Sequence, residues 1–171
     1  MDLMTGEYST IASLFRVNPE SSNNPRHYED YIRFNALLDY NKGMGVTYIF
    51  VEEFEDVKNI MGFVSLRSSS LIKDMGERLK FGYPALEIAE LAVDSRYEHQ
   101  GIGSDMVKFA ISQANDLSKT IGIQYVVLCS DPKSVGFYKK LKFDELSSLE
   151  EVPREHANLG CTPMYLKIKS Y

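Results

Sequence analysis

A chain of 171 residues with a formal net charge of −5 has the size of one globular domain. Hydrophobic residues make up 44% of it and aromatic residues 12%, which is enough for a full core and excludes an intrinsically disordered protein. The negative charge argues against a dedicated nucleic-acid binder, because phosphate backbones attract basic surfaces. We expect one domain over residues 1–171.

The sequence also carries signals about membranes, metals and compartment. No apolar run approaches 18 residues, so we expect neither a membrane span nor a membrane partner. The first residues lack the basic start and the apolar stretch of a secretory signal. Cys129 and Cys161 lie far apart and have no metal-ligand spacing, which predicts two reduced thiols and no metal. These features together predict a cytoplasmic protein.

The first clear element in chain order is a helix. Asn24 is a favourable helix cap, and Pro25 suits the first helical position. The pair Lys42–Gly43 predicts the end of this helix. One face of the helix is predicted to carry Tyr31, Phe34 and Leu38.

Three strands are predicted next. Residues 46–53 are rich in β-branched and aromatic residues, and residues 59–66 form their antiparallel partner across an acidic turn. Residues 67–84 are polar and mixed, and the third strand covers residues 86–93 after Pro84.

The second half alternates helices and strands. A helix begins at Gly101 and stops at Gly122, a buried strand covers residues 123–129, and Asp131–Pro132 start a short helix. Two further strands are predicted near Phe143 and at residues 164–168. The apolar stripe of the long helix comprises Met106, Ala110, Ala114, Leu117 and Ile121. Helices around a mixed sheet define an α/β layer architecture.

The most informative segment is residues 87–104, EIAELAVDSRYEHQGIGS. A strand ends at Val93–Asp94, and Gly101-Ile102-Gly103 opens the long helix. The start of a helix leaves backbone N–H groups without partners and carries partial positive charge, which suits phosphate oxygens. Neither the GxGxxG pattern with its distant acidic residue nor GxxxxGK[ST] is present, which argues against dinucleotide and nucleoside triphosphate sites.

This segment resembles the pyrophosphate loop of the GNAT superfamily of N-acetyltransferases, whose pattern is Gln/Arg-x-x-Gly-x-Gly/Ala. Residues 98–103, EHQGIG, occupy that pattern. Residues 131–138, DPKSVGFY, resemble the family's second motif, Asn-x-x-Ala-x-x-Phe-Tyr. The resemblance covers about residues 46–170. It implies a GNAT-type mixed, mostly antiparallel central sheet of about six or seven strands, with helices on both faces.

The resemblance implies acetyl-CoA as cosubstrate. Its pantetheine chain would lie along the strand end at Leu91, Ala92 and Val93, whose backbone N–H groups could also stabilise an oxyanion. The remaining implied binding residues are His99, Gln100, Gly101, Ile102, Gly103, Ser104, Asp131, Ser134 and Tyr138. Glu98 departs from the family by placing a carboxylate near the diphosphate, where like charges repel. We expect it to point away or to weaken binding, with Arg96, His99 and Gln100 compensating.

The resemblance also implies catalytic roles. Tyr138 occupies the position of the family tyrosine that donates a proton to the leaving thiolate. An acceptor amine must lose a proton, and Glu87, Glu90 or water alone could receive it. Strand alternation places the two glutamates on opposite faces. A structural salt bridge to Arg67 or Lys80 is the alternative explanation for these carboxylates.

Three functions stay open. The first is acetylation of a small-molecule or peptide amine. The second is suggested by YPALEIAELAVD, FYKKLKF and PMYLKI, which resemble GNAT toxins that acetylate aminoacyl-tRNA. Such toxins usually carry a basic residue where Glu90 stands, and tRNA is the one nucleic-acid partner considered. The third is a non-catalytic acetyl-CoA sensor, with Glu98 as the feature favouring it. We expect a monomer or a homodimer.

Overall fold

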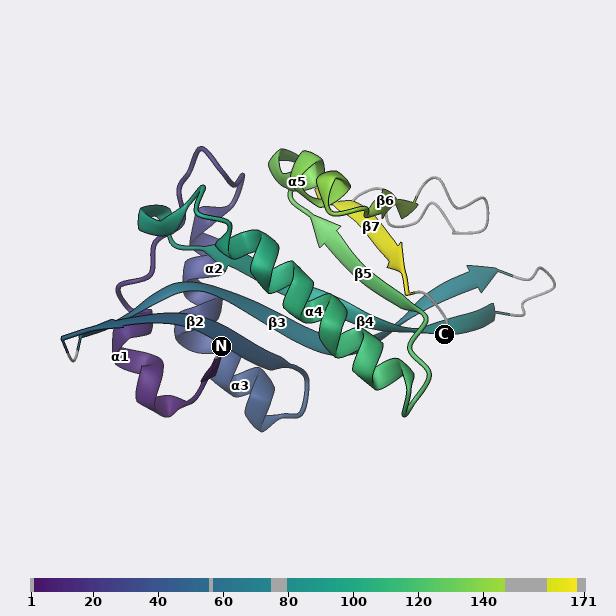
Figure 1. Cartoon of the computed structure of the whole chain (residues 1–171), viewed down its shortest axis with the longest axis horizontal. Coiled ribbons are helices and arrows are strands. Elements are labelled where there is room, and N and C mark those ends of the chain that lie inside the picture. Colours follow the sequence, from purple (N-terminus) through teal and green to yellow (C-terminus); the bar gives the residue numbers. More distant parts are fainter. Residues whose placement is uncertain (1, 56, 75–79, 147–159, 169–171) are drawn as a thin grey trace. The chain divides into compact units, whose positions relative to one another are not determined.

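The computed structural model describes residues 2–55, 57–74, 80–146 and 160–168 (Figure 1). Within them, the strands are hydrogen-bonded in the order β1-β2-β3-β4-β5-β7-β6. The chain divides into two compact units, which are described in turn. The first unit comprises Met1–Arg67 and Ala89–Lys108, and the second comprises Ser68–Ile88 and Phe109–Tyr171. The strands and helix that contribute to both are β3, Val57–Asp74, β4, Lys80–Val93, and α4, Ile102–Ser118.

The strands of the first unit follow the predicted pattern and extend beyond it. Strand β2, Val46–Phe54, pairs antiparallel with β3, and β1, Asp2–Leu3, pairs antiparallel with β2. Both β3 and β4 continue into the polar segment 67–84, which the sequence left unassigned. Polar side chains on such strand ends hide the alternation by which a half-buried strand is recognised.

The helices of the first unit are short and nearly consecutive. They are η1, Gly6–Tyr8, α1, Ser9–Ala12, α2, Pro25–Asp30, the π-helical segment η2, Tyr31–Asn35, and α3, Ala36–Asn41. Pro25 occupies the first helical position as predicted, whereas the side chain of Asn24 makes no capping hydrogen bond. Lys42 follows α3 as its cap and Gly43 adopts φ +67°, which confirms the predicted end.

The predicted apolar face of this helix is wrong beyond its first member. Tyr31 is buried, but Phe34 is 63% exposed and Leu38 is 50% exposed. The π-helical segment explains the difference, because its wider turn rotates the following residues relative to a regular 3.6-residue repeat. Ile32 and Ala36 are the residues buried in their place.

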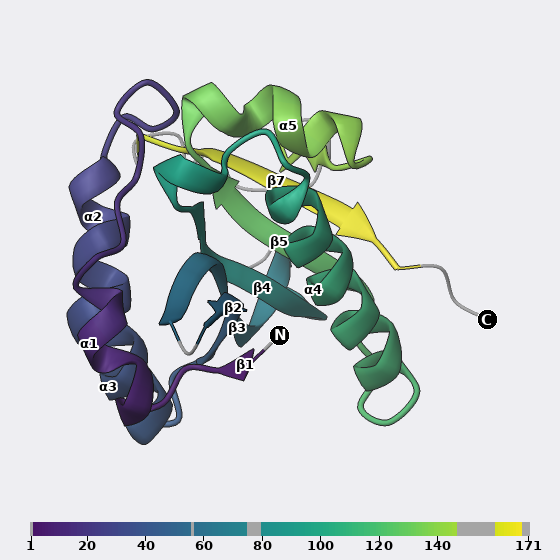
Figure 2. The same cartoon turned by 60° about the vertical axis from the view of Figure 1, so that its left-hand side comes forward.

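The core of the first unit forms around Phe63 of β3. Its ring lies 5.4 Å from that of Phe15 and 5.9 Å from that of Tyr31. The neighbouring Gly62 faces the other way, since a Cβ built on it would lie 2.8 Å from Cε of Met106. Within this unit, therefore, α1 to α3 cover one face of the strands and the first turns of α4 cover the other (Figure 2).

The second unit contains β5, Tyr125–Ser130, whose parallel neighbour is β4 and whose antiparallel neighbour is β7, Thr162–Lys167. The short strand β6, Asp144–Glu145, pairs antiparallel with β7. Between β5 and β6 lie η4, Pro132–Ser134, and α5, Val135–Lys140. With one parallel pair among mostly antiparallel ones, the α/β class and the mixed sheet are as expected.

The long helix α4 also follows its prediction. Met106, Ala110 and Ala114 are fully buried, and Gly122 ends the segment at φ +74°. Ile121 was wrongly included in the buried stripe, because it lies beyond the last helical turn and is exposed.

The two cysteines were predicted to be reduced thiols, and that prediction is wrong. Cys129 and Cys161 form a disulfide, with their Cα atoms 5.5 Å apart. The register explains the pairing: Ser130 of β5 lies opposite Thr162 of β7, so Cys161 enters β7 beside the end of β5. A sequence separation of 32 residues gave no indication of this proximity.

Candidate active site

The residues implicated by the sequence belong to both units, and each group is described within its own unit. The first unit contains Glu90, the strand end Leu91–Val93 and the turn 99–104. The second contains Glu87, Asp131, Ser134 and Tyr138.

Asp94 anchors the segment that leads into the turn. Its fully buried carboxylate accepts hydrogen bonds from the backbone N–H of Arg16, 3.0 Å, and of Arg96, 3.0 Å. The guanidinium of Arg96 adds bonds of 2.8 Å from Nε and 3.2 Å from Nη2. Burial opposes ionisation, but these donors outweigh it, and the pKa of Asp94 lies below its usual value. Asp94 is therefore a charged anchor at the base of the turn.

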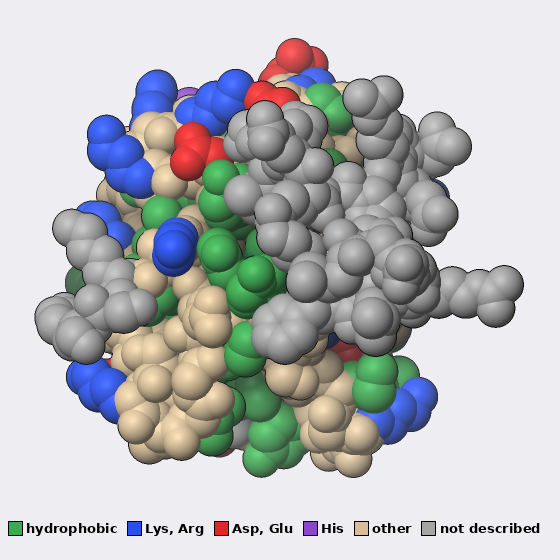
Figure 3. Space-filling model, turned by 90° about the vertical axis from the view of Figure 1, so that its right-hand side faces the viewer, with side chains coloured by type: hydrophobic (Ala, Val, Ile, Leu, Met, Phe, Trp, Pro, Cys, Tyr) green, Lys and Arg blue, Asp and Glu red, His purple; other side chains and the backbone are tan. Residues whose placement is uncertain are grey.

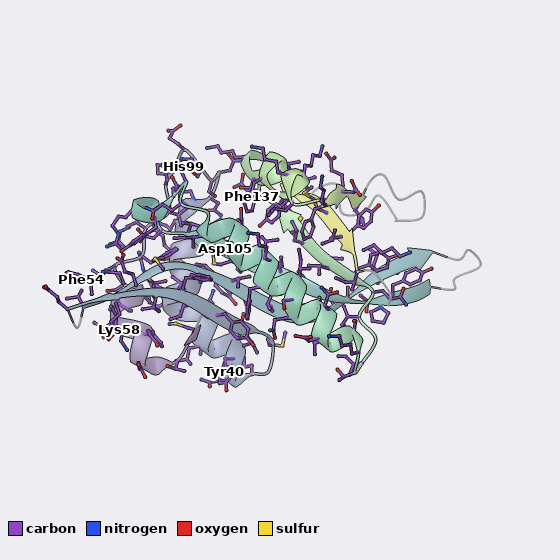
Figure 4. The ribbon with its side chains drawn as sticks, viewed as in Figure 1. Tyr40, Phe54, Lys58, His99, Asp105 and Phe137 are labelled. Atoms are coloured by element: carbon purple, nitrogen blue, oxygen red, sulfur yellow. A yellow bond between two sulfur atoms is a disulfide. The ribbon has the colours of Figure 1, made fainter. Side chains whose placement is uncertain are left out.

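The turn itself has an unusual backbone. His99 adopts φ +62° and Gly101 adopts φ +86°, so two left-handed residues flank Gln100. Ile102 begins α4, and the N–H of Asp105 makes the first helical bond, 3.0 Å to the carbonyl of Gly101. Figure 4 marks His99 before this turn and Asp105 after it.

The geometry of this turn fits an anion. The N–H groups that precede the first helical bond have no intrahelical acceptor, and successive amides around left-handed residues form anion-binding concavities. A Cβ built on Gly101 would meet no atom within 4 Å, so the space beside the turn is open. These features suit the oxygens of a diphosphate.

The carboxylate of Glu98 has a defined partner in the first unit. Its Oε2 accepts a hydrogen bond of 2.9 Å from Nδ2 of Asn18. Arg96, which was expected to compensate for Glu98, is instead committed to Asp94 and lies over the ring of Tyr97, 5.4 Å from its centre. Asn18 was not identified from the sequence, because it lies 80 residues away and belongs to no motif.

The end of β4 is closely packed against its neighbour. A Cβ on Gly62 would lie 3.0 Å from the carbonyl oxygen of Ala92, so only glycine leaves this carbonyl undisturbed. The N–H of Asp94 bonds to the carbonyl of Met61, 2.8 Å. Ala92 is buried, whereas Leu91 and Val93 are partly exposed. The backbone at residues 91–93 is thus held rigidly in β4.

Glu90 is paired with a histidine that the sequence did not single out. Nε2 of His27 lies 2.9 Å and 3.0 Å from the two carboxylate oxygens of Glu90. The Glu90 side chain is 18% exposed and the His27 side chain 47%. Burial raises the pKa of Glu90 above its usual value, His27 and Arg67 lower it, and Asp39 raises it further. The pair therefore joins a shielded carboxylate to a solvent-accessible imidazole.

The other candidate base, Glu87, lies in a different setting. It is partly exposed, and in the parallel pairing of β4 with β5 it lies opposite Val127. Glu87 and Glu90 are three residues apart, so they point to opposite faces of β4, as predicted. The suggested salt bridges to Arg67 or Lys80 give way, for Glu90, to the bond with His27.

Tyr138 lies in an aromatic cluster of the second unit. It is 7% exposed, and its ring lies 4.9 Å from that of Phe137 and 5.7 Å from that of Phe143. Asp131 caps the preceding turn by accepting from the N–H of Lys133, 2.9 Å, as predicted. Ser134 precedes α5 without a side-chain capping bond.

Neither a metal centre nor a membrane segment emerges from the described part of the chain. Residues 2–55, 57–74, 80–146 and 160–168 contain no cluster of three or more histidine, cysteine or acidic side chains placed to bind a metal ion. Among the helices of these same residues, none has the length and apolarity needed to cross a membrane.

Comparison with known proteins identifies the family. The model of the acetyltransferase (GNAT) family matches residues 9–143. The matched range includes the turn at 99–104 and Tyr138, the residues that carry the two sequence motifs.

Several solved structures share the fold. A tyrosine-to-phenylalanine mutant of the toxin AtaT is 16% identical, with 99% of this chain and 89% of that chain covered and a TM-score of 0.78. AtaT complexed with acetyl-methionyl-tRNAfMet is 16% identical, with 97% and 92% covered and a TM-score of 0.75. AtaTR bound with AcCoA is 17% identical, with 98% and 91% covered and a TM-score of 0.73. At these identities the similarity shows a common fold.

Proposed function

Since the chain belongs to the acetyltransferase (GNAT) family, we propose that it transfers an acetyl group from acetyl-CoA to a primary amine by direct attack in a ternary complex. The observation that carries this proposal is the turn at residues 99–104, where two left-handed residues lead into the open start of α4. A fold shared with AtaTR bound with AcCoA supports the same donor.

The donor is held by the backbone more than by side chains. The N–H groups of Gly101, Ile102, Gly103 and Ser104 would bind the diphosphate, with His99 and Gln100 flanking it. The rigid strand end at residues 91–93 would pair with the pantetheine chain, and its N–H groups would hydrogen-bond to the thioester carbonyl oxygen. Acetyl-CoA supplies an activated acetyl group, which the chain orients towards the incoming nitrogen. Asp131 and Ser134 are the remaining proposed contacts.

Tyr138 is the proposed acid. A neutral phenol can donate a proton or a hydrogen bond to the sulfur of the leaving thiolate. The aromatic packing around Tyr138 restricts its ring, which would keep the hydroxyl in one orientation. The match of residues 131–138 to the family motif supports this role.

Glu90 is the favoured proton acceptor, ahead of Glu87 and of water alone. A carboxylate with a raised pKa is a better base than an ordinary one, and a half-exposed imidazole offers a route for the proton to solvent. Glu90 also directly precedes the strand end at residues 91–93. Glu87 has no comparable imidazole partner among the bonds described above.

The amino group of an aminoacyl-tRNA is the acceptor that we favour. The solved structure of AtaT with acetyl-methionyl-tRNAfMet supports this choice, since it shares the fold. Four exposed lysines of the second unit could contact RNA phosphates, namely Lys133, Lys139, Lys140 and Lys142. Elsewhere the basic residues are scattered, and Figure 3 shows lysine and arginine side chains at several separate places on one face.

A small-molecule or peptide amine is the second candidate acceptor, favoured by the net charge of −5 and by Glu90. An acidic side chain in place of a basic one suits a cationic amine better than an RNA backbone. The non-catalytic sensor is the third candidate, and it predicts tight acetyl-CoA binding without transfer to any amine.

The test is an acetyl-transfer assay with radiolabelled acetyl-CoA. Bulk tRNA charged with all amino acids, uncharged tRNA, and a panel of small amines and peptides are offered separately. We expect label in the aminoacyl-tRNA fraction only, and growth arrest on expression that Tyr138→Phe relieves. Label in small amines alone would select the second acceptor class, and thiol release with none of these acceptors would refute the enzyme.

A further inference from the structure

The N-terminal segment Arg16–Asn18, here called the strap, lies along the residues that lead into the diphosphate turn. Ser95 N–H donates to the carbonyl of Arg16, 2.8 Å, and the N–H of Arg16 donates to Asp94. The third contact is the bond from Asn18 to Glu98. Three contacts between segments about 80 residues apart fix the strap against the base of the turn.

The side chain of Asn18 is itself held in place. Its Oδ1 accepts a hydrogen bond of 3.0 Å from the N–H of Glu20, which leaves the NH₂ group to donate to Glu98. The strap is also anchored to α2, because the N–H of Val17 donates to Oε1 of Glu29, 3.1 Å. A donor fixed at both ends can restrain a charged partner.

This restraint matters because Glu98 brings a negative charge to a turn proposed to bind another. Two like charges a few ångströms apart repel, and the repulsion grows as the carboxylate approaches the anion. Glu98 is only three residues from Gly101, so its side-chain orientation determines that distance.

We propose that Asn18 is a positioning residue for the cosubstrate: it holds the Glu98 carboxylate on the strap and thereby sets the affinity of the turn for the diphosphate of coenzyme A. This inference rests on the proposed function. It assigns to this chain a partner for the carboxylate that replaces the family's Gln or Arg.

The test is calorimetric titration of coenzyme A into four proteins: unmodified, Asn18→Ala, Glu98→Gln, and the double variant. Asn18→Ala frees the charged carboxylate, and we expect binding to weaken about tenfold. Glu98→Gln removes the charge, and we expect binding to tighten severalfold. In the double variant, loss of Asn18 should cost less than twofold, because no charge remains to be restrained.

Salt provides a second readout, since screening shortens the reach of the repulsion. The effect of Asn18→Ala should shrink towards unity at about 1 M NaCl. The matched control is Asn41→Ala at the exposed end of α3, which should bind coenzyme A as the unmodified chain does. Thermal unfolding of each variant verifies that it is folded.

Three outcomes would overturn the inference. Equal affinities in all four proteins would show that Glu98 does not act on the ligand. An equal loss from Asn18→Ala with Glu98 or Gln at position 98 would make the strap a purely structural support. If the unmodified chain binds no coenzyme A, the proposed function fails, and this inference fails with it.

Discussion

The imidazole of His27 and the carboxylate of Glu90 are joined by Nε2 at 2.9 Å and 3.0 Å from the two oxygens, although 63 residues separate them. The contact connects α2 to β4 immediately before the strand end proposed to hold the thioester. It gives Glu90 a partner that changes its proton affinity, and so makes the choice of base testable.

Replacing Glu90 should remove the base and its signature in the pH profile. Burial raises the pKa of Glu90, so the acidic limb of kcat/KM should lie above that of an ordinary carboxyl. Glu90→Gln should lower kcat/KM by about 10²-fold and abolish this limb. His27 lowers the pKa of Glu90, so His27→Gln should move the limb to higher pH.

Glu87→Gln is the matched control for this profile, because it removes a carboxylate from the same strand. It should leave the acidic limb where it is. If Glu90→Gln retained the full rate and Glu87→Gln did not, the assignment of the base would be reversed.

Asp94 should stabilise the fold in a pH-dependent way. Its pKa is depressed, so its contribution is present above the unfolded value of about 3.9 and is lost as pH falls through the lower folded value. Asp94→Asn should cost about 1–3 kcal/mol at pH 7, because a buried carboxylate with four donors is replaced. Urea unfolding at pH 7 and pH 2.5 measures this, and a difference that persists undiminished at pH 2.5 would contradict the account.

Tyr138→Phe should reduce turnover by about 10²-fold or more while leaving coenzyme A affinity unchanged. The ring and its contacts with Phe137 and Phe143 are retained, so the thermal midpoint should shift little. Steady-state rates, calorimetry and thermal unfolding separate these effects. A variant with an unaltered rate would restrict Tyr138 to a packing role.

The disulfide predicts a simple chemical result. Protein denatured without reductant should show no thiol among its two cysteines, and reduction should expose both. Cys129→Ser combined with Cys161→Ser should lower the free energy of unfolding by about 2–4 kcal/mol. Two titratable thiols in unreduced protein would return the cysteines to the state that the sequence suggested.

These residues show what a sequence can and cannot reveal. The strands, the long helix and the turn at Gly101 were predictable, because periodicity and glycine position are local signals. The exposure of Phe34 was not, because a single π-helical segment changes the face of everything after it. The partners His27, Asn18 and Cys161 depend on tertiary pairing across 32 to 80 residues, which no local pattern records.

The most direct test of the central claim is calorimetric titration of coenzyme A into the unmodified chain and into Gly103→Glu. Gly103 is preferable to Gly101, where the left-handed backbone would strain any side chain, and Gly6→Glu adds the same charge at an open, exposed position as control. We predict 1:1 binding to the unmodified and Gly6→Glu proteins and none to Gly103→Glu. Unchanged affinity in Gly103→Glu, or no binding to the unmodified chain, would contradict a diphosphate site at the start of α4.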